Sequence, residues 1–435
     1  MKRLAFQVVD LGFGDSGKGT WVDFLVRRHS ADLVVRFNGG PQAGHNVVLP
    51  DGRHHCFAQF GSGSFVPGVR TFLSRWMIVE PYAMLAEERH LQSIGVVDAF
   101  SRTFLDSRSL VITPLQQVAN RIRERSRGDG AHGTCGVGLG ECMRDGLDRP
   151  DLCITAADLA DAAILRTKLP AALEFKRETL RGLRGFATAD ELRVLDDPNW
   201  IATAIDAYGQ VGQRATILSA ADANRLLGET RCVVYEGAQG VLLDERYGFH
   251  PHVTWSKTTF TNADLLLMEA EADVNRVRIG VIRSYLTRHG RGPFNTFAPS
   301  IQQHLPEPHN AGDGWQGQFR RGPLDLALLR YAIRACGGID ELAVTHLDRL
   351  GSVPSMLLDI DGEIESADVL SIPPHRFFAM DSRIAHSLAG IDASTFMQQL
   401  QHWLDAPVNY ASFGPTCADK RSRVPAISGG QFRPT

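Results

Sequence analysis

The stretch VVDLGFGDSGKGT, residues 8–20, joins an apolar run to a glycine-rich turn. The apolar residues that lead into it predict a buried strand, and the turn predicts backbone amides that face an anion. Gly12, Gly17 and Lys18 have the G-x-x-x-x-G-K spacing of a P-loop, but Gly19 stands where a magnesium-binding Ser or Thr would follow. The turn therefore predicts a phosphate-binding loop of a different kind, or a strand–helix turn without a ligand.

The composition favours a globular protein that binds neither nucleic acid nor a membrane. Of its 435 residues 43% are hydrophobic and 22% charged, and the net charge is only −3. This charge provides no basic field for nucleic acid, and no apolar run is long enough for a membrane span. Seven cysteines without a C-x-x-C pair favour reduced thiols in a cytoplasm. The N-terminal apolar stretch predicts a strand and not a signal peptide.

A second strand followed by a glycine-rich loop comes soon after the first. Residues 33–37 predict a buried strand, and FNGGPQAGHN continues it with His45 between Gly44 and Asn46. A histidine in this position is suited to reach a ligand and to act as a general acid near neutrality, although many loop histidines are only solvent-exposed. Two such loops predict one phosphate site at the carboxyl ends of neighbouring strands.

Further strand ends along the chain carry polar side chains. Strands are predicted at 232–235, 277–282 and 342–345, and they lead into EGAQG, RSYLTRHGRGPF and THLD. The pattern predicts one large sheet with a nucleotide site along its carboxyl edge. GAHGTCGVGLG at 130–140 is a third glycine cluster, and the charged stretch ECMRDGLDRP after it predicts a mobile loop.

Taken together, these motifs resemble the adenylosuccinate synthetase family. The motifs are GDSGKG (14–19), AGHN (43–46), GTCGVG (133–138), EGAQG (236–240), GPF (292–294), Arg320-Arg321, THLD (345–348) and FGPT (413–416). The resemblance implies one α/β domain over 1–435, with a mostly parallel central sheet, a mainly helical insertion at about 155–230 and a P-loop-like GTP site. It also implies a cytoplasmic homodimer that uses GTP and Mg²⁺ to couple aspartate to C6 of IMP, giving adenylosuccinate, GDP and phosphate through a 6-phosphoryl intermediate.

The resemblance implies a role for each matching residue. Asp15 would be the base that removes the N1 proton, and it would bind Mg²⁺ with the carbonyl of Gly44. His45 would be the acid that steadies the γ-phosphate, and Lys18 would neutralise phosphate charge. On the GTP side the matches are Ser16, Gly17, Gly19, Arg320, Thr345, His346, Asp348, Ser412, Gly414 and Pro415. For IMP and aspartate they are Gln42, Ala43, Thr134, Gln239, Thr254, Gln318, Arg320 and Arg321.

The first loop departs from the family pattern G-T-Q-W-G-D-E-G-K-G. Asp10-Leu11-Gly12-Phe13 replaces G-T-Q-W, and Ser16 replaces the glutamate. This opening is similar to a phage branch that makes a 2-aminoadenine precursor from dGMP and that can use an adenine nucleotide as donor. That branch has serine at the catalytic aspartate, so Asp15 favours hypoxanthine over guanine as the base. Asp348 favours guanine as the base of the phosphoryl donor. His346 replaces the usual lysine, and this loses an aliphatic stem that packs on that base.

The segment that would bind the amino acid departs further. The family pattern T-T-G-R-x-R-R is replaced by WQGQFRR at 315–321, so that Gln318 takes the place of the first arginine. Glutamine cannot replace the charged two-pronged contact of arginine with a carboxylate. Either Arg288 or Arg291 holds aspartate, or the amine is a different one. The family also borrows an arginine from the partner subunit, for which Arg144 and Arg149 are the candidates.

Two alternatives therefore accompany the main hypothesis of an adenylosuccinate-forming ligase. The first keeps the chemistry on a dGMP-like nucleotide or with another amine. The second is a nucleotide-binding regulator that has lost ligation, which the altered amino-acid segment favours and Asp15, Lys18 and His45 oppose. His250 and His252 form a His-x-His pair, but no third metal ligand accompanies them.

Overall fold

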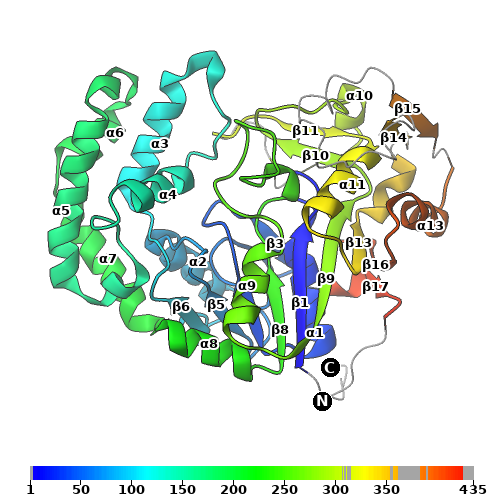
Figure 1. Ribbon diagram of the computed structural model, residues 1–435, viewed down its shortest axis with the longest axis horizontal. Coiled ribbons are helices and arrows are strands. Elements are labelled where there is room, and N and C mark those ends of the chain that lie inside the picture. The colour runs from blue at the N-terminus through cyan, green and yellow to red at the C-terminus, as the bar shows by residue number, and fades with distance from the viewer. Residues whose placement is uncertain are drawn as a thin grey trace.

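A ten-stranded sheet in the order β17-β16-β13-β9-β1-β8-β2-β5-β6-β7 forms the centre of the molecule (Figure 1). The computed structural model describes residues 3–305, 307, 310, 315–352, 356–360, 383–387 and 390–424. Neighbouring strands are parallel except β16 and β17, which are antiparallel. This confirms the predicted α/β class with a mostly parallel sheet. The strands are β1 (Arg3–Asp10), β2 (Leu33–Arg36), β5 (Arg70–Leu73), β6 (Thr103–Asp106), β7 (Thr216–Leu218), β8 (Cys232–Glu236), β9 (Val274–Arg283), β13 (Glu341–Thr345), β16 (Val408–Ser412) and β17 (Lys420–Ser422).

The central strand β1 is buried on both faces, as its continuous apolar run requires. It pairs in parallel with β8 and β9, so that Val8 lies opposite Glu236 and Asp10 opposite Val281. The register brings the carboxyl ends of these strands to one edge of the sheet. The glycine loop after Asp10 therefore opens beside the turns that follow β8 and β9.

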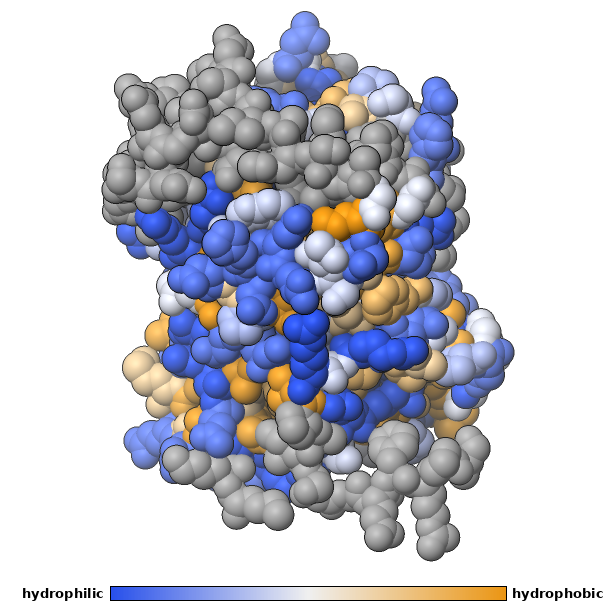
Figure 2. Space-filling model, turned by 90° about the vertical axis from the view of Figure 1, so that its right-hand side faces the viewer, coloured by the Kyte–Doolittle hydropathy of each residue, from blue (hydrophilic) through white to orange (hydrophobic). Residues whose placement is uncertain are grey.

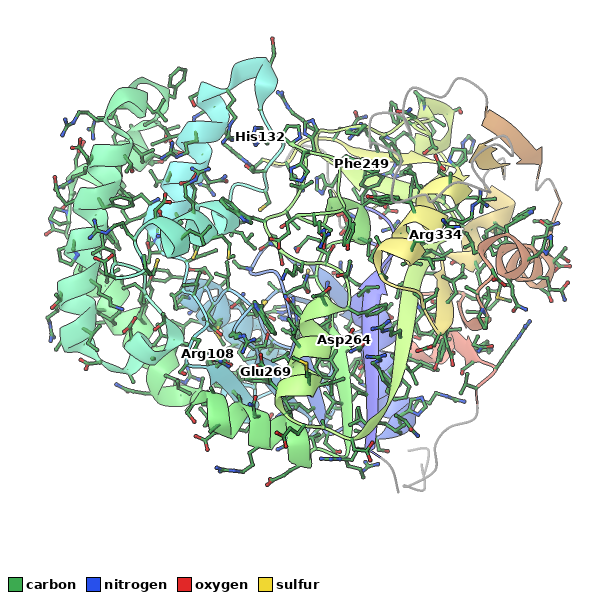
Figure 3. The ribbon with its side chains drawn as sticks, viewed as in Figure 1. Arg108, His132, Phe249, Asp264, Glu269 and Arg334 are labelled. Atoms are coloured by element: carbon green, nitrogen blue, oxygen red, sulfur yellow. The ribbon has the colours of Figure 1, made fainter. Side chains whose placement is uncertain are left out.

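Helices cover both faces of the sheet. Helix α1 (Lys18–His29) packs on one face through Trp21, Val22 and Leu25. The other face carries α8 (Ala220–Glu229), α9 (Thr261–Glu269), α11 (Leu326–Ala335) and α13 (Ala393–Leu404). Polar contacts fix α9 on the sheet (Figure 3): Asp264 accepts a hydrogen bond from Gln7 of β1 at 2.9 Å, and Glu269 pairs with Arg75 at 2.6 Å.

A helical lobe extends from the β7 end of the sheet, at the left of Figure 1. It contains α2 (Pro81–Ser93), α3 (Pro114–Ser126), α4 (Leu139–Asp148), α5 (Ala162–Thr179), α6 (Ala189–Asp196) and α7 (Trp200–Arg214). Its apolar core is continuous with side chains of β5 and β6. Most of residues 155–230 is helical, and β7 lies within the same stretch.

The mobile loop predicted for residues 141–150 is wrong, because α4 occupies most of this stretch. Leu139 and Cys142 pack with Ile78 and Ile112 in a small apolar cluster. On the same helix the buried carboxylate of Asp145 pairs with the equally buried Lys176 of α5 at 2.5 Å. Tertiary contacts of this kind outweigh the weak helical preference of a charged, glycine-containing segment.

Shorter elements surround the carboxyl edge. They are the hairpin of β3 (His45–Val48) and β4 (His54–Phe57), the pair β10 (Leu286–His289) and β11 (Phe319–Gly322), the set β12 (Leu324–Asp325), β14 (Met356–Ile360) and β15 (Arg383–Ser387), and the short helix α10 (Pro299–Gln302). Short 3-10 turns lie at Phe100–Arg102, Gly128–Gly130, Ala156–Ala160, Arg181–Phe186, Val241–Leu243, Leu347–Ser352 and Cys417–Asp419. Hydrophilic and hydrophobic residues are interspersed on the side that carries α13 (Figure 2). Within the described ranges no helix combines the length and apolarity that a bilayer crossing needs.

Candidate active site

The carboxyl edge of the sheet opens into a cavity of about 570 Å³. This volume is in the usual range for small-molecule sites. Its walls include these residues expected from the sequence: Asp15, Gly17, Lys18, Gly19, Gln42, Ala43, Gly44, His45, Gln239, Thr345, His346, Asp348, Ser412, Gly414 and Pro415. A shallower depression of about 730 Å³ lies at the amino ends of β9 and β13, and none of these residues lines it. The cavity at the carboxyl edge is therefore the candidate active site.

The glycine loop presents the carboxylate of Asp15 to the cavity. Gly14, Asp15 and Gly17 have φ values of 94°, 63° and 88°, and this left-handed backbone turns the chain sharply. Burial raises the pKa of Asp15, and the charges of Arg283 and Lys18 oppose this rise. Among the described residues no side chain forms a hydrogen bond with this carboxylate. It is thus available to a proton or to a cation.

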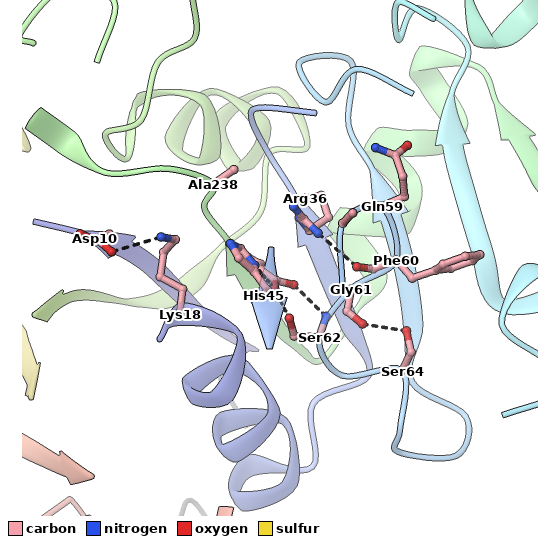
Figure 4. A network of polar contacts seen from close by, with 12 residues as sticks. Asp10, Lys18, Arg36, His45, Gln59, Phe60, Gly61, Ser62, Ser64 and Ala238 are labelled. Carbon is pink, nitrogen blue, oxygen red and sulfur yellow. Dashed lines mark hydrogen bonds and ion pairs between the residues drawn. The ribbon is translucent and has the colours of Figure 1, made fainter. Parts of the chain in front are cut away.

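His45, the first residue of β3, forms a buried pair with Glu236 at the end of β8. Its Nδ1 lies 2.5 Å from Glu236 Oε1, and the backbone N–H of Ser62 donates to the other carboxylate oxygen at 2.9 Å (Figure 4). Burial raises the pKa of Glu236, but Arg36 and His45 lower it to about 2. Burial lowers the pKa of His45 to about 4 despite Glu236. The ring is therefore neutral near pH 7, with Nδ1–H donating to the carboxylate, and no hydrogen bond to Nε2 is present among the described residues.

Arg283 at the end of β9 is a site residue that the sequence analysis did not single out. Its Nε donates to the backbone carbonyl of Asp15 at 2.6 Å and its Nη1 to the hydroxyl of Tyr285 at 2.8 Å. The guanidinium also forms an ion pair with Glu307. Arg283 fixes the backbone that carries Asp15. Glu236 was also missed, although both residues directly follow predicted strands at the edge where the site was expected.

The side of the cavity expected to hold the purine nucleotide contains unpartnered amide groups. The side-chain oxygens of Gln42 and Gln239 are buried without a hydrogen-bond partner among the described residues. Such groups cost free energy unless a ligand or water bonds to them. Thr134 and Thr254 do not line the cavity themselves. Each is next to its wall, because Thr134 precedes Cys135, a lining residue, and the N–H of Thr254 donates to the carbonyl of Leu243 at 2.8 Å.

The opposite end of the cavity joins three distant parts of the chain. The hydroxyl of Thr345 donates to the carbonyl of Ser16 at 3.0 Å, and that of Thr20 donates to the carbonyl of Pro415 at 2.8 Å. Ser16 itself is buried behind the loop. The carboxylate of Asp348 lies 3.0 Å from Nε of Arg349. Asp348 therefore contributes a carboxylate to the cavity wall together with Thr20, Thr345 and Pro415.

Gln318, Arg320 and Arg321 do not line the cavity, whereas Gln316 does. Arg320 Nη2 donates to the carbonyl of Gly290 at 2.6 Å, and Arg321 Nη1 to that of Gln302 at 3.0 Å.

The other two arginines that could hold a carboxylate also bond to backbone carbonyls. Arg288 donates to the carbonyls of Arg291, Pro293 and His252, and Arg291 donates to that of Asp129. Burial and the charge of Arg320 lower the pKa of Arg288 to about 9. Neither Arg288 nor Arg320 has a carboxylate partner in the described part of the chain, so an anion would stabilise the pair.

Arg144 and Arg149 lie outside the cavity on α4 and at its end. Arg144 pairs with Glu141 at 2.7 Å and lies 6.0 Å from the ring centre of Trp255, the neighbour of Thr254. Arg149 pairs instead with Asp151 at 2.7 Å.

A glycine loop, an available carboxylate and a histidine–carboxylate pair at the edge of a parallel sheet define a nucleotide-binding α/β enzyme. The family model described as adenylosuccinate synthetase matches residues 7–420, so the chain belongs to the adenylosuccinate synthetase family. Members of this family are ligases that form a carbon–nitrogen bond, and so is this protein. The family reaction is the GTP-dependent ligation of aspartate to IMP.

Named relatives and solved structures agree with this placement. Adenylosuccinate synthetase of Chlorobium chlorochromatii is 29% identical over 95% of this chain and 96% of its own length. That of Mycobacterium bovis is 32% identical over 85% of this chain and 82% of its own. The fold is similar to that of fully ligated adenylosuccinate synthetase from Plasmodium falciparum (TM-score 0.77, 21% identity, 96% and 99% covered). It is also similar to cyanophage S-2L succinoaminodeoxyadenylate synthetase bound to dGMP and dATP (TM-score 0.62, 16% identity, 97% and 96% covered).

Proposed function

We propose that this protein couples L-aspartate to C6 of IMP with GTP as phosphoryl donor, and releases adenylosuccinate, GDP and phosphate. The observation that carries the proposal is the meeting of Asp15, Lys18 and His45 in one cavity. A homodimer in the cytoplasm is the further expectation from the family resemblance.

The chemistry needs a base and an acid on the two sides of the transferred phosphoryl group. Asp15, whose pKa is raised by burial, takes the N1 proton of IMP, and the charge moves to O6. O6 then forms a bond to the γ-phosphorus while the bond to GDP breaks. The amine of aspartate attacks C6, phosphate leaves and the amine loses a proton.

His45 and Lys18 act on the phosphoryl group. Negative charge beside Nε2 favours the protonated ring, which Glu236 stabilises from the other side. The protonated His45 then donates a hydrogen bond to the γ-phosphate as GDP leaves. Lys18 lines the same cavity and neutralises part of the triphosphate charge.

A magnesium ion fits the oxygen atoms at this edge. Mg²⁺ prefers carboxylate and carbonyl oxygens. Asp15 supplies a carboxylate without a described side-chain partner, and Gly44 is in the cavity wall. Bound there, Mg²⁺ would neutralise charge that develops on the phosphates.

The two ends of the cavity suggest where each nucleotide binds. Asp348 would accept hydrogen bonds from N1–H and the 2-amino group of guanine, and Ser412 and Pro415 line the same cavity. Gln42 and Gln239 offer amide oxygens to the second nucleotide. Arg288 and Arg320 lack a described carboxylate partner, and this supports an amine substrate that carries one.

A second candidate keeps the chemistry and changes the purine. The fold likeness to a phage enzyme that binds dGMP and dATP, together with the altered first loop, favours a dGMP-like substrate. Asp15 opposes it, because a carboxylate there leaves less room for a 2-amino group.

Phosphate release from GTP with Mg²⁺ tests both candidates. Release that requires IMP and aspartate together is expected, and release with dGMP in place of IMP would favour the second candidate. If no nucleotide supports phosphate release in the presence of aspartate, other amines should be tested next. Failure with these as well would favour a nucleotide-binding regulator. The variant Asp15→Asn is expected to lose at least about 100-fold in turnover and to keep nucleotide binding.

A further inference from the structure

The carboxylate of Asp10 lies inside the glycine loop. Asp10 is the last residue of β1 and is 1% exposed. Its Oδ1 accepts the backbone N–H of Gly12 at 2.8 Å, and its Oδ2 accepts that of Ser16 at 2.9 Å. Oδ2 also lies 3.3 Å from Nζ of Lys18 (Figure 4). An anion of the chain itself therefore occupies the turn.

These three donors are of the kind that a glycine loop offers to a phosphate. Here the carboxylate of Asp10 accepts hydrogen bonds from two of the backbone amides and forms an ion pair with the ammonium group of Lys18. Lys18 is 2% exposed but still lines the cavity, and an ammonium group has further N–H donors to direct there. Asp10 thus holds the loop and Lys18 in a fixed arrangement and compensates the lysine charge.

This arrangement departs from the usual pattern of the family. The family pattern for this loop has glycine at position 10 and glutamate at position 16, where this protein has aspartate and serine. The loop has two carboxylates, as the family pattern does. In the family pattern the second carboxylate is at position 16, whereas in this protein it is at position 10, at the end of β1. The turn closes tightly on this group, because a Cβ at Gly12 would lie 3.3 Å from Asp10 Oδ1.

We propose that Asp10 is the internal counter-anion of the glycine loop: it positions Lys18 and sets a limit on how tightly the loop binds a nucleoside triphosphate. This rests on the proposed function, which places the phosphoryl donor beside Lys18. Lys18 is paired with Asp10 and also interacts with the charge of Asp15, so its ammonium group is shared with carboxylates of the chain before the nucleotide binds. A weaker grip on phosphate also favours release of GDP after each turnover.

Equilibrium binding of GTP and of guanosine to the full-length chain tests this proposal. In Asp10→Asn the affinity for GTP should rise about tenfold, because a negative charge beside the triphosphate is lost, while guanosine binding stays within about twofold. A weaker GTP affinity in Asp10→Asn would overturn the proposal, since it would make Asp10 only a brace for the loop amides. Asp23→Asn is the matched control, because Asp23 is a buried carboxylate of α1 that pairs with Arg27 and does not line the cavity.

A double variant keeps the test decisive if Asn at position 10 disturbs the loop. Lys18→Gln should weaken GTP binding by at least about 30-fold, because the carboxylate then has no counter-ion. Adding Asp10→Asn to Lys18→Gln should recover about tenfold of that loss, and an absence of recovery overturns the proposal. The readout of this test is binding and not catalysis. If the two Asp10→Asn variants bind GTP as expected but the parent protein releases no phosphate, the proposed function is contradicted and the inference about Asp10 stands. Turnover with an unchanged or weakened GTP affinity in Asp10→Asn would overturn the inference alone.

Discussion

At the scale of single residues, Glu236 determines which nitrogen of His45 carries the proton. The carboxylate is fully buried, and the short contact with Nδ1 fixes the tautomer. Partners of this kind orient a functional histidine without touching the substrate.

Glu236→Gln should therefore lower kcat by about 10–100-fold and change the KM for GTP by less than about threefold. The amide cannot stabilise the protonated ring, while the cavity walls stay in place. Steady-state kinetics give both parameters. Glu87→Gln is the control, because that buried carboxylate accepts backbone N–H groups of Gln59 and Phe60 and does not line the cavity. An unchanged kcat in Glu236→Gln would contradict the assigned role.

A second histidine links stability to pH. His29 is 3% exposed, its ring centre lies 4.5 Å from that of Phe6, and neither ring nitrogen has a hydrogen-bond partner in the described chain. Burial lowers its pKa from 6.5 to about 4. Between about pH 4 and pH 6.5 the His29 ring therefore binds a proton in the unfolded chain but not in the folded chain. This contribution to stability is present above pH 6.5 and is lost as the pH falls toward 4.

His29→Phe removes this proton linkage. As the pH falls from 7 to 5, the parent loses about 1–2 kcal/mol of unfolding free energy through this histidine, and the variant does not. The difference in unfolding free energy, variant minus parent, should therefore increase by that amount. Urea denaturation at the two pH values measures the change. His402→Phe on the exposed face of α13 should show no such difference. Parallel pH curves for parent and His29→Phe would show that the ring is protonated in the folded state.

At the scale of elements, the turn after β8 packs directly on the glycine loop after β1. The N–H of Leu242 donates to the carbonyl of Gly12 at 3.0 Å. A Cβ at Gly240 would lie 2.2 Å from that carbonyl oxygen and 2.3 Å from the N–H nitrogen of Gly14. The two loops therefore have to move apart if any side chain is added.

Gly240→Ala should lower the melting temperature and weaken GTP binding at least about tenfold, because the displaced loop carries Asp15 and Lys18. Thermal unfolding and nucleotide titration follow the two effects. Gly209→Ala makes the same change within α7, where no atom lies within 4 Å of the added Cβ, and it should stabilise the chain by about 0.5 kcal/mol. Equal effects of the two variants would refute the packing argument.

The elements also show how far the sequence predicts the site. The strands and their glycine turns were predictable, because a buried apolar run and the glycines after it are local features, as in β1 and β8. The helix α4 was not, since its formation depends on Ile78 and Lys176 from distant segments. The contacts of Glu236 with His45 and of Arg283 with Asp15 join residues far apart in the chain, so only the register of the sheet reveals them.

At the scale of the whole molecule, the cavity is assembled from residues between Phe13 and Pro415. An arginine from a second subunit would complete it if the family resemblance extends to the dimer. Arg144 is the better candidate in this structure, because its guanidinium lies 6.0 Å from the ring centre of Trp255, the neighbour of Thr254. Leu147, on the same helix, is 70% exposed, as expected of a residue that a partner covers. Both arginines pair with a carboxylate, Arg144 with Glu141 and Arg149 with Asp151, so the contact with Trp255 is what distinguishes Arg144.

Mixing two inactive variants tests this assignment. Arg144→Leu and Asp15→Asn should each lose most activity as homodimers. In a refolded equal mixture about half of the dimers are hybrids, and one of the two sites in each combines an intact Asp15 with an intact Arg144 of the partner subunit. The mixture should therefore regain about a quarter of the parent phosphate release, whereas the homodimers stay inactive. Arg149→Leu should remain active on its own, because Arg149 lies over the ring of Phe175 and not beside Trp255. A mixture of Arg144→Leu and Asp15→Asn that regains no activity would contradict the assignment to Arg144. So would an inactive Arg149→Leu whose mixture with Asp15→Asn regains activity.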